Sequence, residues 1–163
     1  MLGEVFEEVL QAVREACLRE YGARLQSLAV FGSVARGTVR ADSDIDLLIV
    51  ADPLPDGRMA RVAEFEAIER LVCGALAKAR EQGVATTLSP VFKTPSELEA
   101  GSLLFLDMTD QARLLVDRHG ILRRYLDGLS RRMAALGSRR VACRGGYYWL
   151  LKPDLKPGEE IRL

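Results

Sequence analysis

Two aspartates at the start of a predicted strand are the residues whose types and spacing most clearly suggest chemistry. Asp44 and Asp46 open an apolar, β-branched run that continues to Val50. Residues two apart in a strand share a face, so both carboxylates are expected to point the same way and Ile45 the opposite way. Like charges on one face repel each other, and a divalent cation with oxygen ligands removes that repulsion. Because Mg²⁺ takes one or two protein carboxylates and completes its shell with substrate phosphates and water, the pair predicts a metal site.

A glycine turn lies a short way upstream of the aspartates. The apolar run Leu28 to Phe31 predicts a buried strand that breaks at Gly32-Ser33, where a residue without Cβ and a small hydroxyl let a ligand approach closely. A short helix expected over Ser33 to Gly37 turns free N–H groups toward this turn, and such groups favour a phosphate. Arg36 either reaches the same anion or pairs with an aspartate, and the sequence leaves both open.

Two common phosphate and metal loops lack the residues they need here. Gly32-x-x-x-x-Gly37-Thr38 has the glycine spacing of a P-loop, but no lysine follows the second glycine. Asp42-x-Asp44-x-Asp46 begins like an EF-hand loop, which needs glycine sixth and glutamate twelfth, where this chain has Leu47 and Pro53. An acidic turn without function is the remaining alternative, and the coupled glycine turn argues against it.

The whole stretch resembles the signature of a known family. Gly32-Ser33-Val34-Ala35-Arg36-Gly37, followed by Ser43-Asp44-Ile45-Asp46-Leu47, is similar to the minimal nucleotidyltransferase family of the DNA polymerase β-like superfamily. The resemblance implies that Gly32 and Ser33 lie against a nucleoside triphosphate and that Asp44 and Asp46 bind Mg²⁺ or Mn²⁺. Arg36 and Ser43 are further candidates for nucleotide binding. The strong similarity covers residues 25 to 50, and the tail from Gly146 to Pro153 is more weakly similar to longer members.

The family implies a reaction and a set of acceptors. An acceptor hydroxyl attacks the α-phosphorus of a nucleoside triphosphate, with ATP expected, and pyrophosphate leaves. Small members often act with a helical HEPN partner in toxin–antitoxin pairs, where the nucleotidyltransferase adenylylates the partner protein, so a protein acceptor is the first choice. Others modify aminoglycosides or nucleic-acid ends, and a net charge of zero disfavours nucleic acid. The rival interpretation is a catalytically weakened module that only binds nucleotide or neutralises a partner.

A third carboxylate expected from the family is missing. Fully active members carry it on the strand after the long helix, which is expected here over Val84 to Phe92, yet no Asp or Glu occurs between Glu81 and Glu97. Alignment through Thr94-Pro95 places Ser89 at the missing position, with Thr87 on the same face as the alternative. A neutral hydroxyl is a weak ligand and a weak base, so we expect triphosphate binding with slow transfer.

Hydrophobic periodicity predicts the elements that position these residues. The pattern indicates an α/β (α+β) arrangement with a small mixed sheet flanked by helices, and the resemblance implies that this is the nucleotidyltransferase fold. We expect one domain over 1–163, with a core of about 22–117 and a C-terminal helical extension and tail over 118–163. Helices are expected from Leu2 to near Gly22, from Met59 to Gly83, after the capping box of Thr94 and Glu97, around Leu103 to Leu106, and from Ile121 to Leu136; strands are expected over Leu25–Phe31, Ile45–Val50, Val84–Phe92 and Gln111–Val116.

Composition sets the remaining expectations. With 163 residues, 48% hydrophobic and 28% charged, the chain is typical of a globular protein, and its acidic N-terminus and short apolar runs predict a cytoplasmic protein without a membrane segment. Cys17, Cys73 and Cys143 are expected to be buried free thiols, and His119 a surface turn residue.

The C-terminal third is strongly basic. From Arg118 to Lys152 it carries nine basic residues against one acidic residue, Asp127, which indicates either a solvated helix face or a patch for an anion. Tyr147, Tyr148 and Trp149 either dock this tail onto the body or offer a stacking surface to a nucleobase.

Overall fold

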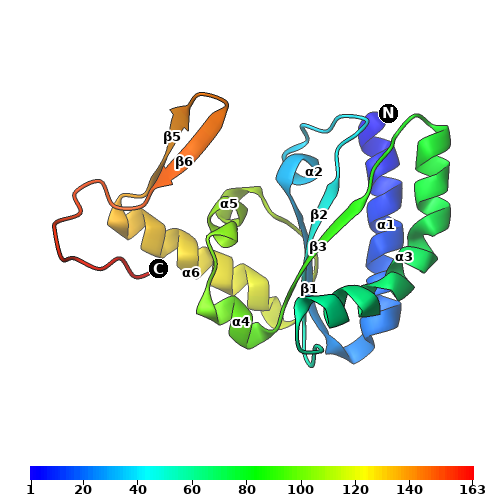
Figure 1. Ribbon diagram of the computed structural model, residues 1–163, viewed down its shortest axis with the longest axis horizontal. Coiled ribbons are helices and arrows are strands. Elements are labelled where there is room, and N and C mark those ends of the chain that lie inside the picture. Colours follow the sequence, from blue (N-terminus) through cyan, green and yellow to red (C-terminus); the bar gives the residue numbers. More distant parts are fainter.

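A four-stranded mixed sheet forms the centre of the computed structural model, which describes all residues 1–163 (Figure 1). Its strands are β1 (Leu25–Phe31), β2 (Ile45–Ala51), β3 (Leu88–Lys93) and β4 (Arg113–Asp117), in the order β3-β2-β1-β4. β1 runs antiparallel to β2 and β4, whereas β2 and β3 are parallel. The end of β1 and the start of β2, which carry the candidate residues, therefore meet at one end of the sheet.

Helices cover both faces of this sheet (Figure 1). On β2, Ile45, Leu47 and Ile49 belong to the core under α1 (Leu2–Tyr21) and α3 (Arg58–Glu81). Leu48 and Val50 belong to the core under α4 (Pro95–Ala100), α5 (Leu104–Gln111) and α6 (Ile121–Leu136). Since side chains alternate along a strand, Asp44 and Asp46 share the face of the second core. The predicted α/β class with a mixed sheet flanked by helices is confirmed.

Several predicted helix boundaries are confirmed. α1 ends at Tyr21, directly before Gly22, and α3 and α6 occupy the expected ranges. The capping box at α4 is present, because the Thr94 hydroxyl accepts from the Glu97 N–H (3.2 Å) and the Thr94 N–H donates to the Glu97 carboxylate (2.9 Å). Local side-chain chemistry thus fixes this helix start. His119 lies exposed in the short 3₁₀ turn Arg118–Gly120, as predicted.

The third strand begins later than predicted. The expectation of a strand from Val84 was wrong for its first four residues, since β3 starts at Leu88. Residues 84–87 instead bond to the irregular loop before β2: the Ala85 N–H donates to the Ala41 carbonyl (2.7 Å) and the Thr86 hydroxyl to the Ser43 carbonyl (2.7 Å). The loop before β2 has no regular strand backbone with which residues 84–87 could pair. These residues have high β-propensity, but they form hydrogen bonds to the loop and not to a strand.

A C-terminal hairpin was not predicted. β5 (Arg139–Cys143) and β6 (Gly146–Leu150) pair antiparallel in a second sheet that projects from the end of α6 (Figure 1). Three consecutive aromatic residues, Tyr147, Tyr148 and Trp149, lie on β6, and aromatic residues are enriched in strands.

The cysteine expectation was wrong in part. All three cysteines are free, but only Cys17 is buried, whereas Cys73 on α3 and Cys143 at the hairpin turn are exposed. Both exposed positions lie on elements with one solvent face. No helix combines the length and apolar character needed to cross a bilayer.

One arginine joins the start of α3 to the edge of the sheet. Arg61, whose side chain is only 12% exposed, donates to both Glu97 oxygens (2.8 and 2.9 Å), to the Pro55 carbonyl (2.8 Å) and to the Phe92 carbonyl (3.4 Å). The Arg61 hydrogen bonds, with the Thr94 backbone, hold the pKa of Glu97 at about 2. α3, β3 and α4 are therefore tied together through one guanidinium.

We expect Arg61→Met to lower the free energy of unfolding by about 1 to 3 kcal/mol, because the charged hydrogen bonds of a largely covered side chain are lost while its aliphatic stem is kept. Urea denaturation measures the loss, and Arg70→Met, an exposed change on the same helix, serves as the control.

The pH dependence provides a second check. A carboxylate with a lowered folded-state pKa stabilises the fold above its unfolded pKa and loses that contribution as the pH falls. The destabilisation caused by Glu97→Gln should be full at pH 7 and shrink between about pH 4.5 and 2. A constant difference over that window would contradict the role of this pair.

Candidate active site

The glycine turn and the second aspartate are in direct contact. Phe31 at the end of β1 pairs with Asp46 on β2, and Gly32 follows with φ +70°. A Cβ built on Gly32 would lie 3.3 Å from Asp46 Cγ and nearer still to its Oδ2. Glycine is required at position 32 for two reasons: the backbone is left-handed there, and the Asp46 carboxylate occupies the space that a Cβ would need. The predicted association of the turn with the carboxylates is therefore present in the fold.

The turn continues into α2 (Gly32–Arg36), a single short helix. The Thr38 N–H donates to the Ser33 carbonyl (3.0 Å) and the Gly37 N–H to the Val34 carbonyl (3.2 Å), while Gly37 takes the left-handed conformation that ends the helix. Val34 is buried and anchors α2 against the core. Ser33, half-buried at the start of α2, is thus held by packing beside Gly32.

The two aspartates repel each other across an otherwise open end of the sheet. Burial raises the pKa of Asp46, and the negative charge of Asp44 raises it further. The Ser89 hydroxyl and the positive charge of Arg36 act in the opposite direction. A half-buried carboxylate next to a second carboxylate is the donor set that a hard divalent cation neutralises, so these residues fit Mg²⁺.

Two hydroxyls lie opposite the two carboxylates, that of Ser89 on β3 and that of Thr87 just before the strand. Asp46 is in register with Ser89, and the Thr87 hydroxyl donates to Asp44 Oδ1 (2.7 Å). Nowhere does the chain gather three or more His, Cys, Asp or Glu side chains in a metal-binding group. The two positions named for the missing carboxylate therefore both face the site, with Ser89 beside Asp46 and Thr87 beside Asp44.

Arg36 and Ser43 have different surroundings. Arg36 is exposed and forms no ion pair with Asp44 or Asp46, so the expected alternative of an aspartate pair is not realised, although its charge reaches Asp46. The Ser43 hydroxyl accepts from the Arg40 N–H (2.8 Å) and closes the loop before β2. Ser43 thus has a clear role in shaping that loop.

The hairpin near α5 was missed by the sequence analysis. The Tyr147 hydroxyl and the Trp149 indole N–H both donate to Asp107 Oδ1 (2.7 and 2.8 Å), and the Arg140 guanidinium lies 5.0 and 4.9 Å from the two ring centroids. The hydrogen bond to Asp107 raises the pKa of Tyr147, which the charges of Arg140 and, more weakly, Arg36 oppose. The aromatic residues therefore dock the tail, on the side of the fold where α2 carries Arg36.

Comparisons with known proteins agree with this arrangement. A family model described as a nucleotidyltransferase domain matches residues 10–81. A protein of Methanocaldococcus jannaschii with the name "Putative protein adenylyltransferase" is 30% identical over 129 residues, or 78% of this chain and 80% of that protein.

Solved structures with a similar trace include a toxin–antitoxin crystal structure with AMP-PNP, at 19% identity and a TM-score of 0.43, which covers 80% of this chain and 91% of that chain. Another is a mutant of the toxin–antitoxin MntA-HpeT, at 18% identity and a TM-score of 0.40, which covers 74% of this chain and 86% of that chain.

In class, then, the protein is an enzyme that transfers nucleotides. The chain belongs to the nucleotidyltransferase domain family, as the signature around Gly32 and Asp46 predicted.

The contact between Gly32 and Asp46 gives a sharp prediction. Gly32→Ala should displace the Asp46 carboxylate and lower the free energy of unfolding by about 1 to 3 kcal/mol, because strain at positive φ adds to the overlap. We expect ATP binding in Mg²⁺, measured by calorimetry, to be lost.

The matched control is Gly37→Ala. Gly37 also has φ +70°, but a Cβ at this position would meet nothing within 4 Å, so this variant carries the strain alone. Equal losses of ATP binding in the two variants would show that the close approach to Asp46 is not what the site needs.

Proposed function

We propose that this enzyme transfers the nucleoside monophosphate of ATP, in the presence of Mg²⁺ or Mn²⁺, to a hydroxyl group of a protein. The observation that supports this most directly is the contact of the Gly32 turn with Asp46. This contact brings the turn expected to bind the triphosphate next to the two carboxylates expected to bind the metal. Such a transfer depends on positioning and charge neutralisation more than on covalent chemistry by the protein.

Asp44 and Asp46 are the residues that would hold the metal. Their shared face at the start of β2 and the raised pKa of Asp46 support this assignment. A bound divalent ion neutralises charge on the phosphates and polarises the α-phosphoryl group.

The remaining residues would bind and orient the substrate. Gly32 leaves room for the Asp46 carboxylate at the turn where the triphosphate would lie, Ser33 presents a hydroxyl beside that turn, and the exposed guanidinium of Arg36 adds a positive charge. In the reaction the acceptor oxygen forms a bond to the α-phosphorus, the bond to the leaving pyrophosphate breaks, and the acceptor proton passes to solvent. Thr87 and Ser89 are neutral hydroxyls and weak bases, so we expect slow transfer.

A protein is the acceptor we favour. The M. jannaschii relative carries the name of a protein adenylyltransferase, and the family resemblance implies a HEPN-type partner in a toxin–antitoxin pair. A net charge of zero argues against nucleic acid. The second candidate, a weakened module that binds nucleotide without efficient turnover, is favoured by Ser89 at the position of the third carboxylate.

The metal assignment predicts that Asp44→Asn with Asp46→Asn abolishes metal-dependent ATP binding. The fold should be retained, and its free energy of unfolding should rise by up to about 1 kcal/mol, because a like-charge repulsion is removed. Calorimetric titration with ATP in Mg²⁺ measures the loss of ATP binding, and urea denaturation measures the change in the free energy of unfolding.

Asp42→Asn is the control, since Asp42 lies on the same loop but pairs with Arg40. In a lysate with ATP labelled on the α-phosphate, wild type and the control should label an acceptor protein and the double variant should label none. Undiminished ATP binding by the double variant, or the absence of a labelled protein, would refute the proposal.

Restoring a carboxylate is the test of the missing ligand. Ser89→Asp should raise the rate of transfer by about tenfold or more, since it adds a ligand and a base beside Asp46. The same variant should have a lower melting temperature without metal and a larger stabilisation by Mn²⁺, because three carboxylates repel until a cation binds.

Thr87→Asp is the companion variant, facing Asp44 instead of Asp46. If only Thr87→Asp raises the rate of transfer, the position of the missing third carboxylate is residue 87 and not residue 89. No gain in rate or in cation-dependent stability from either variant would contradict our interpretation of the site.

A further inference from the structure

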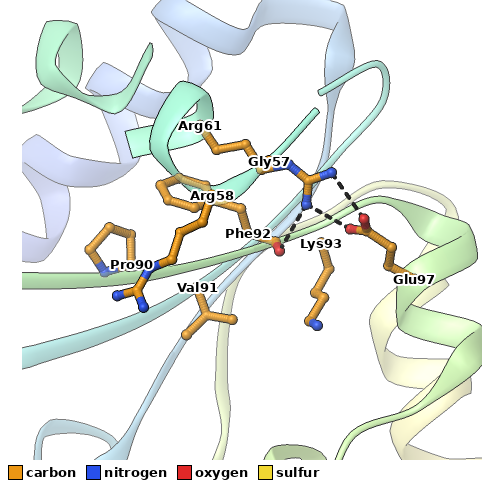
Figure 2. Close-up of a pocket in the computed structure, with 8 residues that line it drawn as sticks. All are labelled: Gly57, Arg58, Arg61, Pro90, Val91, Phe92, Lys93 and Glu97. Atoms are coloured by element: carbon orange, nitrogen blue, oxygen red, sulfur yellow. Dashed lines mark hydrogen bonds and ion pairs between the residues drawn. The ribbon is translucent and has the colours of Figure 1, made fainter. Parts of the chain in front are cut away.

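A pocket opens along the free edge of β3, on the strand that carries Ser89, and none of its lining residues belongs to the candidate active site itself. Its volume is about 480 Å³, and Figure 2 shows its lining from α3, β3 and α4: Gly57, Arg58, Arg61, Pro90, Val91, Phe92, Lys93 and Glu97. Pro90 directly follows Ser89, which is in register with Asp46. The pocket therefore begins where the strand leaves the site.

The pocket carries two positive charges outside any ion pair, those of Arg58 and Lys93, and the charge of Lys93 also acts on Glu97. Arg61 and Glu97 satisfy each other through two hydrogen bonds (2.8 and 2.9 Å), and Asp56 acts on Arg61 from outside the lining. Arg58 and Lys93 form no ion pair, and Figure 2 shows both head groups directed away from the Arg61–Glu97 pair. A ligand with negative groups fits this distribution of charge.

The backbone edge of β3 is closed to another strand. Pro90 has no N–H to donate, and the Phe92 carbonyl already accepts from Arg61 (3.4 Å). Addition of a peptide strand needs both kinds of group free along the edge. Recognition in the pocket therefore depends on the side chains of Arg58 and Lys93 and on the apolar side chains of Pro90 and Val91, which lie on opposite faces of the strand at its edge.

We propose that this pocket binds acidic side chains of the protein acceptor and so directs its hydroxyl to the site beside Ser89. The inference rests on the function proposed above, which supplies the protein acceptor. From Ser89 to Lys93 the strand advances roughly 13 Å, at about 3.3 Å per residue. An extended acceptor segment spans that distance in about four residues, so Asp or Glu should occur within about four positions of the modified hydroxyl.

Protein fits this pocket better than nucleic acid. Two cations in one pocket do not form the track of phosphate contacts that a nucleic acid needs, and the net charge of the chain is zero. Apolar side chains beside the cations, those of Pro90 and Val91, suit the mixed character of a peptide segment.

Peptide binding without ATP tests the pocket independently of catalysis. Fluorescent peptides that carry one hydroxyl residue (tyrosine, serine or threonine), with Glu three and four positions away from it, are compared with matched peptides that carry Gln instead. Binding is measured by fluorescence anisotropy at low and high salt. Wild type should bind the Glu peptide about tenfold more tightly than the Gln peptide, and salt should reduce the difference, because two solvent-exposed charge pairs are formed.

Arg58→Gln with Lys93→Gln should remove this preference, and Arg58→Lys alone should keep it, because a positive charge remains. Arg70→Gln, an exposed change on α3 outside the pocket, is the control. Circular dichroism and calorimetric titration with ATP in Mg²⁺ should be unchanged in all of these variants.

Equal affinity for the two peptides, or a preference that survives the double change, would overturn the inference. Tighter binding of a single-stranded oligonucleotide through Arg58 and Lys93 would overturn it in favour of nucleic acid. Failure of wild type to bind ATP would instead refute the proposed function, while the peptide arm would still report on the pocket.

Discussion

The register between β1 and β2 is the constraint on which the rest of the site depends. Because side chains alternate, a shift of one residue would turn Asp44 and Asp46 toward α1 and α3 and away from the Gly32 turn. Such a shift would also exchange Leu47 and Leu48 between the two cores. The carboxylates are thus aligned by the burial of their apolar neighbours on the same strand, and the unfavourable charge pair is held in place by the core.

Much of this arrangement could be predicted from local signals. The apolar runs of β1 and β2, the capping box of Thr94 and the glycine after α1 each specify their own element, and the structure follows them. The late start of β3 could not be predicted, because Thr86 and its neighbours are as β-prone as the strand itself. What decides their structure is the loop they contact, which is remote in sequence.

The candidate site shows the same division. The glycine turn, the aspartate pair and the lack of a third carboxylate were all visible as residue types at fixed spacings. Which hydroxyl faces which carboxylate, and that Ser43 closes a loop, depend on strand register and loop geometry. The pocket beside β3 depends on three elements that meet only in the fold, so its two free cations, Arg58 and Lys93, carried no signal in the sequence.

The hairpin is fastened to the body in an unusual way, since the Tyr147 hydroxyl and the Trp149 indole converge on one oxygen of Asp107 with Arg140 over both rings. Tyr147 and Trp149 stand two residues apart on β6, so their rings project from the same face of the strand. Both rings therefore depend on the same carboxylate oxygen for their hydrogen bonds. The hairpin therefore has a shared point of attachment on α5, and loss of the Asp107 carboxylate would leave both donors without their acceptor.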